Sequence, residues 1–460
     1  MKKISNALAN ALPKSDFHVS ITGMKETKLQ VALDFLELPR AMKIAQAAVE
    51  GGADYIEIGT PLIKSEGLDA VRQVRKAFPN AIIIADTKTM DAGKIEAEAA
   101  AKAGANIMTV IGAAPESTIR ECVEAGKHYG IKVAVDLLGL ENPVEFAKTA
   151  HELGVDWLDV HCAIDQQMEG KDPFTLLREV RKATDLTLAV AGGINSQSAP
   201  ACIEAGADIV IVGGAITKAL DVVQATKDIK TALATGKAVE SEHFKRATEE
   251  NLREILVTVR TSNVSDGAHR KPCLEGIRPI APGQFACGPA VTVRTFPGDW
   301  AKPVLAIDEA KAGDILVMDA GNCSPAIWGE LASESAKNKG IAGLVVYGAV
   351  RDTGEIRKLG FPVWSSIVTS HAGDPIGSGE INCPIMICNQ EIKPGDWIIA
   401  DDDGVMVLPK EKAVEMANRA AFVLEAENRL REEIREQNST LAQVVNLKRW
   451  EKVDVSEIVG

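Results

Sequence analysis

Short apolar runs alternate with alanine-rich amphipathic segments throughout the first half of the chain. Starting at Leu29, the runs are LQVALDF, DYIEIG, AIIIADTK, NIMTVIG, KVAVDLLG, WLDVHCA, TLAVAGGI and IVIVGGAI. Most are rich in β-branched residues, which favour strands, whereas the intervening segments, such as RAMKIAQAAVEG and GKIEAEAAAKAG, carry apolar residues at helical spacing. The pattern predicts eight consecutive β/α units.

The joints between these units repeat as well. The stretches GGADYIEIG, AGANIMTVIG, LGVDWLDVH and AGADIVIVGG each place a helix-ending glycine shortly before a strand. Eight β/α units within about 200 residues match the count and size of a compact (β/α)8 barrel. A doubly wound sheet is the competing architecture, but such sheets seldom contain eight regular units at even spacing. The predicted fold class is therefore α/β, beginning with an N-terminal TIM barrel.

The regular repeat ends near Leu233, where the small and polar stretch ATGKAVESEH predicts a linker. Beyond it, the helical pattern FKRATEENLREILVTV precedes strands punctuated by Pro and Gly, such as GQFACGPAVTVRTF and DILVMDAG, which indicates a second domain of α+β type. The final stretch KEKAVEMANRAAFVLEAENRLREEIREQ predicts an amphipathic docking helix. The predicted parts are an N-terminal extension at 1–28, the barrel at 29–233, the linker at 234–243 and the second domain at 244–460.

Composition and charge narrow the functional classes. A chain of 460 residues with 46% hydrophobic and 25% charged residues is typical of a folded protein of two domains. The net charge of −13 argues against nucleic acid as a main partner, because binding phosphates along a strand needs clustered Lys and Arg. The eight cysteines form no C-x-x-C pair, and no run approaches the roughly 18 apolar residues of a membrane helix. We therefore expect a cytoplasmic protein with reduced cysteines and no membrane partner.

Ionisable residues collect at the ends of the predicted barrel strands. In (β/α)8 enzymes the chemistry lies at the carboxyl ends of the strands. A single acid there often caps the following helix, but several acids with a lysine and a histidine on one rim favour a catalytic site. The residues at these strand ends are Asp34, Glu57, Asp86, Lys88, Asp91, Asp136 and His161.

Glycines follow the seventh and eighth strands. The stretches AGGI and VGGAIT place Gly192 and Gly193 after one strand and Gly213 and Gly214 after the other. Glycine also serves tight turns, but at these two strand ends it lets backbone N–H groups approach a phosphate. We therefore predict a phosphate site in these turns.

The most specific motif is D-T-K-T-M-D, which contains Asp86, Lys88 and Asp91. This D-x-K-x-x-D pattern resembles the orotidine-monophosphate decarboxylase superfamily. Within that group, LQVALDF, YIEIGTPLI, VHCAIDQQ and VVGGAIT are similar to the 3-hexulose-6-phosphate synthases, over roughly Leu29 to Leu233. The related 3-keto-gulonate-6-phosphate decarboxylases usually carry two arginines where this chain has Ile164 and Gly214. The synthase is therefore favoured, and the alternative is a decarboxylase barrel with a non-catalytic second domain.

The resemblance implies a reversible aldol reaction of formaldehyde with ribulose 5-phosphate that gives 3-hexulose 6-phosphate in the ribulose monophosphate pathway. The negative charge of an enediolate would need fixed positive charge. The resemblance implies Mg²⁺ (or Mn²⁺) held by Glu57 and Asp86, with Lys88 adding charge nearby.

Three further residues receive roles from the same resemblance. Asp34 and Asp91 would orient the lysine or bind substrate hydroxyls, and Asp91 can come from a partner subunit, since related barrels share this motif across a dimer. His161 is the candidate for moving the C1 proton, because the ordinary pKa of histidine lies near neutrality.

Two motifs in the second half carry possible chemistry. WGELASESAKNKG follows a predicted strand and places four backbone N–H groups at a helix start, where they can hold an anion. GAVRD puts Arg351 beside Asp352 at the end of an apolar run. The residues at the predicted helix start are Gly329, Glu330, Leu331 and Ala332.

Together with the acidic turn DDDGVMVLP, these motifs resemble RraA-like proteins and the HMG/CHA-type class II pyruvate aldolases, over about Thr261 to Lys410. The resemblance implies that Asp352 binds a divalent metal, that Arg351 contacts substrate and that the N–H groups of 329–332 hold its carboxylate. A metal-dependent lyase and a regulatory or assembly module both remain open for this half. By the same analogy, dimers of barrels and trimers of RraA-like domains predict a homo-oligomer.

Overall fold

The computed structural model describes residues 26–240 and 245–447. Most of the predicted N-terminal extension (1–25), the end of the predicted linker (241–243) and two parts of the predicted second domain (244 and 448–460) lie outside the described residues. The chain divides into two compact units, one formed by Met1–Gln167 and Lys171–Phe244 and the other by Met168–Gly170 and Lys245–Gly460. Across the described ranges, every helix is too short or too polar to cross a membrane.

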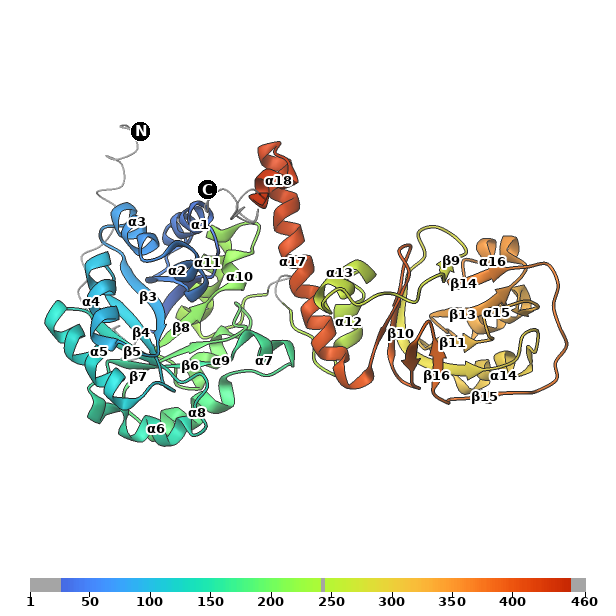
Figure 1. The fold of residues 1–460 in the computed structure, drawn as a ribbon, viewed down its shortest axis with the longest axis horizontal. Coiled ribbons are helices and arrows are strands. Elements are labelled where there is room, and N and C mark those ends of the chain that lie inside the picture. The colour runs from blue at the N-terminus through green and yellow to red at the C-terminus, as the bar shows by residue number, and fades with distance from the viewer. Residues whose placement is uncertain (1–25, 241–244, 448–460) are drawn as a thin grey trace, which may run out of the picture. The chain divides into compact units, whose positions relative to one another are not determined.

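The first unit is a closed barrel of eight parallel strands surrounded by helices (Figure 1). The strands pair in sequence order, and β1 closes the barrel by pairing with β8. This confirms the predicted TIM barrel. The strands are β1 (Lys28–Leu33), β2 (Tyr55–Ile58), β3 (Ile82–Thr89), β4 (Ile107–Ile111), β5 (Lys132–Asp136), β6 (Trp157–His161), β7 (Thr187–Ala191) and β8 (Ile209–Val212).

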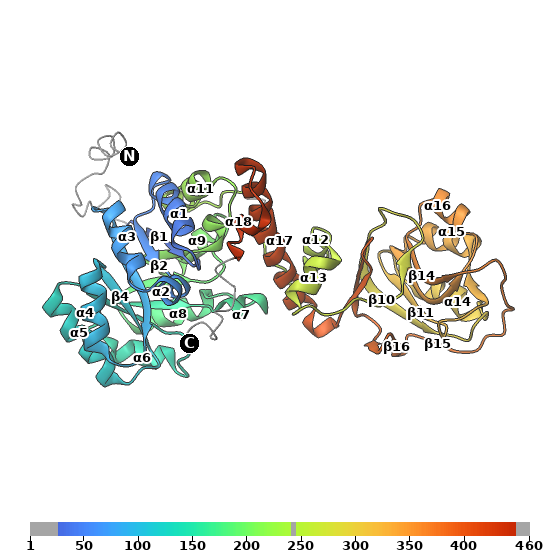
Figure 2. The same ribbon diagram turned by 45° about the horizontal axis from the view of Figure 1, so that its top comes forward.

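The barrel helices follow the strands and pack on their outer faces (Figure 2). They are α1 (Leu38–Glu50), α2 (Thr60–Glu66), α3 (Asp69–Ala77), α4 (Gly93–Ala103), α5 (Glu116–Tyr129), α6 (Pro143–Thr149), α7 (Ile164–Met168), α8 (Phe174–Ala183), α9 (Ala199–Glu204), α10 (Gly214–Thr217) and α11 (Val222–Thr235). Because α11 ends at Thr235, the first residues of the predicted linker still belong to the last barrel helix.

Strand side chains alternate between the outer core and the barrel interior. In β1, Val31 and Leu33 join the core between strands and helices, whereas Ala32 belongs to a separate interior cluster. That alternation has a period of two, as a strand requires. The other buried members of the interior cluster are Ile84, Ile107, Ala134, Trp157, Ala189, Ile209 and Ile211.

The repeated joints have a structural role that their sequence did not reveal. Each places an Asp or Asn before an even-numbered strand. The side-chain oxygen of this Asp or Asn accepts a hydrogen bond from a backbone N–H at the start of the preceding odd-numbered strand. The backbone N–H of the same Asp or Asn donates to the carbonyl of that partner residue, which makes a two-bond clamp. The clamps join Asp54 to Leu29, Asn106 to Ile83, Asp156 to Val133 and Asp208 to Leu188, with side-chain bonds of 2.8, 2.9, 2.9 and 3.0 Å. The barrel therefore consists of four equivalent strand pairs, clamped at the end opposite the acidic rim.

The second unit is built on a mixed nine-stranded sheet of order β19-β18-β10-β11-β13-β14-β9, with β12 and β15 beside that path and a separate β16–β17 hairpin. Its parallel and antiparallel pairings confirm that the regular β/α repeat has ended. The strands are β9 (Arg278–Pro279), β10 (Ala286–Arg294), β11 (Ile315–Asp319), β12 (Ala326–Trp328), β13 (Gly343–Val350), β14 (Val363–Val368), β15 (Glu380–Ile381), β16 (Ile385–Ile387), β17 (Gln390–Ile392), β18 (Trp397–Ala400) and β19 (Val405–Leu408).

Helices cover one face of this sheet, where residues of α14, α15 and α16 share a core with β10, β11 and β13. A second core is formed by other residues of the strands together with the β16–β17 hairpin. A third core joins α12 and α17 to β18 and β19. The helices are α12 (Leu252–Leu256), α13 (Thr261–Gly267), α14 (Ala301–Glu309), α15 (Glu330–Asn338), α16 (Thr353–Leu359), α17 (Ala413–Gln437) and α18 (Leu441–Val444).

One predicted helix is much shorter than expected. The pattern from Phe244 to Val259 predicted a helix. Phe244 lies outside the described residues, and within 245–259 only α12 (Leu252–Leu256) is helical. Asn251 accounts for the late start, because its side-chain oxygen accepts a hydrogen bond from the Thr248 backbone at 2.6 Å. Such a local side-chain turn satisfies the backbone without a helix and places Asn251 at the N-cap.

Candidate active site

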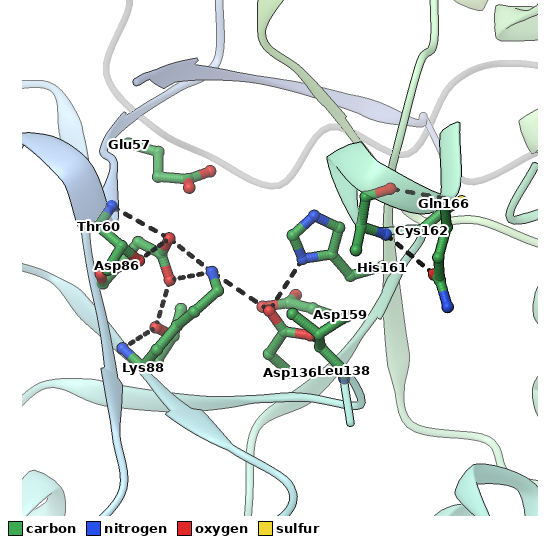
Figure 3. A network of polar contacts seen from close by, with 12 residues as sticks. Glu57, Thr60, Asp86, Lys88, Asp136, Leu138, Asp159, His161, Cys162 and Gln166 are labelled. Atoms are coloured by element: carbon green, nitrogen blue, oxygen red, sulfur yellow. Dashed lines mark hydrogen bonds and ion pairs between the residues drawn. The ribbon is translucent and has the colours of Figure 1, made fainter. Parts of the chain in front are cut away.

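Most of the ionisable residues predicted at the strand ends meet inside the carboxyl end of the barrel, where Figure 3 shows Glu57, Asp86, Lys88, Asp136 and His161. Strand register produces this convergence, since parallel pairing places Ala32 opposite Glu57 and Glu57 opposite Ile84. Asp34 lies two residues after Ala32, and Asp86 lies two residues after Ile84. Asp34 and Asp86 are therefore at the same height along the barrel axis, and Glu57 lies close to them. The structure therefore brings these three predicted acids, from three different strands, to one end of the barrel.

Lys88 is the centre of the network. Its Nζ lies 2.8 and 2.7 Å from the two carboxylate oxygens of Asp86 and 3.3 Å from Oδ2 of Asp136. Burial alone would lower the pKa of Lys88, but the charges of Asp86 and Asp136 outweigh it and raise that pKa. The ammonium is therefore a fixed positive charge inside the site.

Asp86 is buried and held from several directions. Besides Lys88, its carboxylate accepts hydrogen bonds from the hydroxyls of Thr60 and Thr109, both at 2.7 Å. The sequence argument did not include either threonine. The signal that could have found them is position, because Thr60 begins the helix that follows the second strand and Thr109 lies at an inward position of the fourth.

Glu57 and Asp34 are crowded by like charges. Burial, followed by the charges of Asp86 and Asp34, raises the pKa of Glu57 well above its ordinary value. Desolvation first, and Asp86 second, also raise the pKa of Asp34, although its side chain is exposed at the barrel mouth. Gln30, two positions before Ala32, donates from Nε2 to Oε2 of Glu57 at 2.6 Å and was also missed.

The Asp34 carboxylate needs glycine beside it. A Cβ placed on Gly59 would overlap Oδ1 of Asp34, and one placed on Gly213 would lie 3.6 Å from Oδ2. Asp34 therefore lies between the end of β2 and the glycine turn after β8. This brings it next to one of the two turns predicted to bind phosphate.

His161 and Asp136 form a pair at the ends of β6 and β5. The Nδ1 atom of His161 lies 3.0 Å from Oδ2 of Asp136, whose other oxygen accepts the backbone N–H of Leu138 at 2.9 Å. Burial would raise the pKa of Asp136, but the hydrogen bond and charge of His161 and the charge of Lys88 lower it. Burial would lower the pKa of His161, and Asp136 raises it. The imidazole is thus oriented through Nδ1, and proton exchange with a substrate falls to Nε2.

Asp159 is a buried acid that the sequence argument overlooked. It lies opposite Asp136 in the β5–β6 register, and its Oδ1 accepts a hydrogen bond from the Trp157 indole N–H at 2.9 Å. Burial, followed by the charges of Asp136 and Asp86, raises the pKa of Asp159 to about 8. Its signal in the sequence was the alternation in WLDVH, which places Trp157, Asp159 and His161 on the same face of the strand.

The remaining predicted barrel residues lie around this network. Asp91 is exposed in the turn before α4, where its carboxylate accepts the backbone N–H of Ala92 at 2.7 Å. Gly192 has φ of 126°, and a Cβ there would lie 2.7 Å from Cβ of Cys162, so this turn requires glycine. Gly193 also has a positive φ of 67°, and Gly214 is the first residue of α10.

A divalent cation fits the acidic side of the site. Glu57 and Asp86 repel each other in buried positions, and carboxylate oxygens are the ligands that Mg²⁺ prefers. Among the residues that the structure describes, no group of three or more His, Cys, Asp or Glu side chains is arranged to hold a metal. Mg²⁺ commonly takes only one or two protein carboxylates and keeps several waters. Because the Asp86 oxygens are already hydrogen-bonded, a cation there would replace a contact with Lys88.

The predicted elements of the second unit also meet. Arg351 and Asp352 follow β13, and Nε of Arg351 lies 3.4 Å from Oδ2 of Asp352. The same oxygen accepts the backbone N–H of Glu330 at 3.4 Å, and a Cβ on Gly329 would lie 2.6 Å from it. The start of α15 and the Arg–Asp pair thus form one exposed site.

The other two residues at the start of α15 differ in exposure. Leu331 is 79% exposed, whereas Ala332 packs against the neighbouring core.

Two family models match the two units. Residues 27–229 match the Orotidine 5'-phosphate decarboxylase / HUMPS family, and residues 261–407 match the RraA-like family, described as Aldolase/RraA. The first unit has the fold and the rim of a TIM-barrel enzyme. Through this unit the chain belongs to the Orotidine 5'-phosphate decarboxylase / HUMPS family, and part of the second unit matches the RraA-like family model.

Named relatives of the first unit are 3-hexulose-6-phosphate synthases. The protein from Mycobacterium gastri is 42% identical over 208 residues, which are 45% of this chain and 100% of that protein. The protein from Bacillus subtilis is 39% identical over 210 residues, again 45% of this chain and 100% of that protein. The solved 3-hexulose-6-phosphate synthase from Salmonella typhimurium is 37% identical, covers 46% of this chain and 100% of its own, and has a TM-score of 0.44.

A solved relative of the second unit is the RNA-processing inhibitor RraA from Thermus thermophilis. It is 31% identical, covers 33% of this chain and 93% of its own, and has a TM-score of 0.31. The two sets of relatives therefore match different parts of the chain.

Proposed function

We propose that the barrel is a 3-hexulose-6-phosphate synthase, an aldehyde-lyase that joins formaldehyde reversibly to D-ribulose 5-phosphate. The observation that carries this proposal is the buried network of Asp86, Lys88, Asp136 and His161 in a barrel 35–42% identical to proteins of that name. The network supplies both demands of an aldol reaction, which are a group that moves a proton and a fixed positive charge for an enediolate.

Each residue then has a task in the synthesis direction. Nε2 of His161 takes the proton from C1 of ribulose 5-phosphate, while Asp136 holds the ring through Nδ1. The C1 carbon forms a bond to the formaldehyde carbon, and the resulting alkoxide takes up a proton. Throughout, the Lys88 ammonium lies beside the developing negative charge. Mg²⁺ bound by Glu57 and Asp86 would supply Lewis-acid stabilisation of the substrate oxygens.

Substrate binding uses the residues around the network. The turns at Gly192–Gly193 and Gly213–Gly214 offer backbone N–H groups to the phosphate. Asp34, beside Gly213, is placed to accept a hydrogen bond from a sugar hydroxyl. The exposed Asp91 suits a role in a neighbouring subunit of a homo-oligomer.

Formaldehyde release from 3-hexulose 6-phosphate tests the proposal directly. We expect release with Mg²⁺, loss of release after chelation, and a drop of at least about 100-fold in the Asp86→Ala variant, since it loses a metal ligand and the main partner of Lys88. The matched control is Asp185→Ala, which removes an exposed acid far from the rim and should keep full activity. The assigned site would be contradicted if formaldehyde release stayed at the wild-type rate both after chelation and in the Asp86→Ala variant.

Carbon dioxide evolved from 3-keto-gulonate 6-phosphate, without formaldehyde release from the hexulose phosphate, would instead support the decarboxylase. Ile164 and Gly214 argue against that outcome, because neither supplies the cation that a substrate carboxylate would need.

For the second unit we propose a site for a divalent metal and a carboxylate ligand, as a metal-dependent lyase would use. The convergence of Asp352, Arg351 and the start of α15 supports this more than a purely structural module, since Arg351 can engage both oxygens of a carboxylate.

Metal binding to the second unit can be separated from the barrel by measuring Mn²⁺ stoichiometry in an Asp86→Ala background. We expect one remaining equivalent per chain, lost on adding Asp352→Asn. Asn tolerates the left-handed backbone of Asp352, where φ is 56°, so the fold should persist. Glu355→Gln, in the first turn of α16, is the control that should keep the metal. Unchanged stoichiometry in the Asp352→Asn variant would remove Asp352 as a ligand.

A further inference from the structure

Thr109 joins the two reactive residues of β3 to the neighbouring strand. It lies in β4, is only 4% exposed, and its hydroxyl donates to Oδ1 of Asp86 at 2.7 Å. The same hydroxyl oxygen accepts the backbone N–H of Lys88 at 3.0 Å. One side chain thus contacts the carboxylate of Asp86 and the main chain of Lys88 at once.

The segment that carries Asp86 and Lys88 departs from regular strand pairing. Ala85 pairs with Met108 and Thr89 pairs with Val110, so a step of four residues on β3 (89 − 85) faces a step of two on β4 (110 − 108). Thr109 lies opposite this bulge. Where the regular ladder is interrupted, its hydroxyl binds the Lys88 N–H and its carbonyl accepts the Thr87 hydroxyl at 2.7 Å.

Lys88 has a backbone conformation that needs support. Its φ is 44°, in the left-handed region that disfavours residues with a Cβ. Such conformations persist only when surrounding contacts hold them. In this conformation the Lys88 ammonium turns back onto the carboxylate of Asp86 two residues earlier, instead of continuing along the strand.

We infer that Thr109 is a positioning residue for the barrel reaction, whose hydroxyl holds the bulge of β3 in the form that places the Lys88 ammonium on Asp86. The inference rests on the proposed function for its catalytic consequence. Thr109 does not itself touch the reacting atoms and acts through Lys88 and Asp86.

The test compares Thr109→Val, which keeps the shape and loses the hydroxyl, with Thr109→Ser, which keeps the hydroxyl. For formaldehyde release we expect kcat of Thr109→Val to fall roughly 10- to 100-fold, since small misplacements of catalytic groups have effects of this size. KM for the hexulose phosphate should change less than about 3-fold, because the phosphate turns are untouched. Thr109→Ser should recover kcat to within about 3-fold of the wild type.

The matched control is Thr226→Val, which removes another fully buried threonine hydroxyl, one that donates to the Val222 carbonyl within α11. It should leave kcat unchanged. Where Thr109→Val does not fold, Thr109→Ala removes the same hydroxyl with less bulk. Wild-type kcat in a folded variant without the hydroxyl, or no recovery in Thr109→Ser, would overturn the inference.

A crystal structure of Thr109→Val separates this inference from the proposed function. We expect Lys88 to leave the left-handed region and its Nζ to move away from both oxygens of Asp86. If these features persist, Thr109 does not position them. If the wild type releases no formaldehyde, the synthase proposal fails, while the conformation of Lys88 in the variant still decides the role of Thr109.

Discussion

Replacing Lys88 by methionine is expected to lower formaldehyde release by about 1000-fold, since removal of one preorganised electrostatic contact typically costs 100- to 1000-fold. Lys88 contacts both oxygens of Asp86 and lies near Asp136, so its loss also removes the cation that balances these buried acids. Methionine has a similar length and keeps the apolar stem, which isolates the effect of the charge. The measurement is kcat/KM with saturating Mg²⁺.

The same variant should lose stability in a pH-dependent way. Breaking a buried ion pair from one side costs about 3 kcal/mol, because it leaves charge without a partner. Without Lys88, the pKa values of Asp136 and Glu57 should rise, because the charge of Lys88 lowers both. A carboxyl group whose folded-state pKa rises makes the protein less stable as the pH increases. The deficit relative to the wild type should therefore be larger at pH 8 than at pH 5.

The control for Lys88→Met is Lys94→Met. Lys94 is an exposed lysine of α4, shortly after the D-x-K-x-x-D motif. It should match the wild type in both measurements. Lys88 would lose its central role if Lys88→Met retained more than about one tenth of the wild-type kcat/KM, which is too small a loss for a buried catalytic charge.

Replacing Asp159 by asparagine is expected to stabilise the barrel at neutral and alkaline pH. Burial raises the pKa of Asp159 to about 8, whereas an unfolded aspartate titrates near about 4. Below the unfolded pKa both states are protonated and the group costs nothing. Between the two pKa values the folded state must keep a proton that the unfolded state releases, so stability falls as the pH rises, and the loss levels off above the folded pKa.

The size of this effect follows from the shift. Each pKa unit corresponds to about 1.4 kcal/mol, so about 4 kcal/mol at pH 7 is an upper limit for a single independent group. We expect Asp159→Asn to gain about 1–3 kcal/mol at pH 7.5 and close to nothing at pH 4, because the side-chain amide can still accept from Trp157 and carries no charge. Hydrogen exchange of peptides from β5 and β6 measures this gain in the barrel alone.

Asp185→Asn, at an exposed position, is the control for asparagine substitution and should show no gain at either pH. An equal gain for Asp159→Asn at pH 4 and pH 7.5 would mean that ionisation of Asp159 is not the cause. A loss at pH 7.5 would mean that the folded barrel uses Asp159 as a charged group.

The barrel and the positions of most of its rim residues could be predicted from the sequence. Eight short apolar runs with regular helical segments between them leave few alternatives to a closed parallel barrel. Because the carboxyl ends of parallel strands meet on one rim, strand-end position alone brought Glu57, Asp86 and His161 together. In the second unit, the resemblance to RraA-like proteins grouped Arg351 and Asp352 with the helix start, and the structure places them beside the start of α15, after the neighbouring strands β12 and β13.

Some features required contacts that no local pattern encodes. The alternation in WLDVH indicates which face of the strand Asp159 occupies, but its burial beside Asp136 depends on the register between β5 and β6. The helix predicted after Phe244 is shorter than expected because the Asn251 side chain accepts a hydrogen bond from the Thr248 backbone. In both places, a single hydrogen bond or the register of one strand pair outweighed the secondary-structure propensity summed over the surrounding residues.

The way in which the rim is assembled depends on contacts between residues of different strands. Periodicity can place Asp86 and Lys88 on the same face of a strand, but the left-handed backbone at Lys88 and the bulge around it depend on Thr109 of the next strand. The four Asp and Asn clamps likewise need both strands of a pair before the side chain has a partner. Sequence patterns report which face a residue occupies, because that follows from local geometry. The orientation and charge state of a side chain depend on neighbours far along the chain, which only the closed barrel brings into contact.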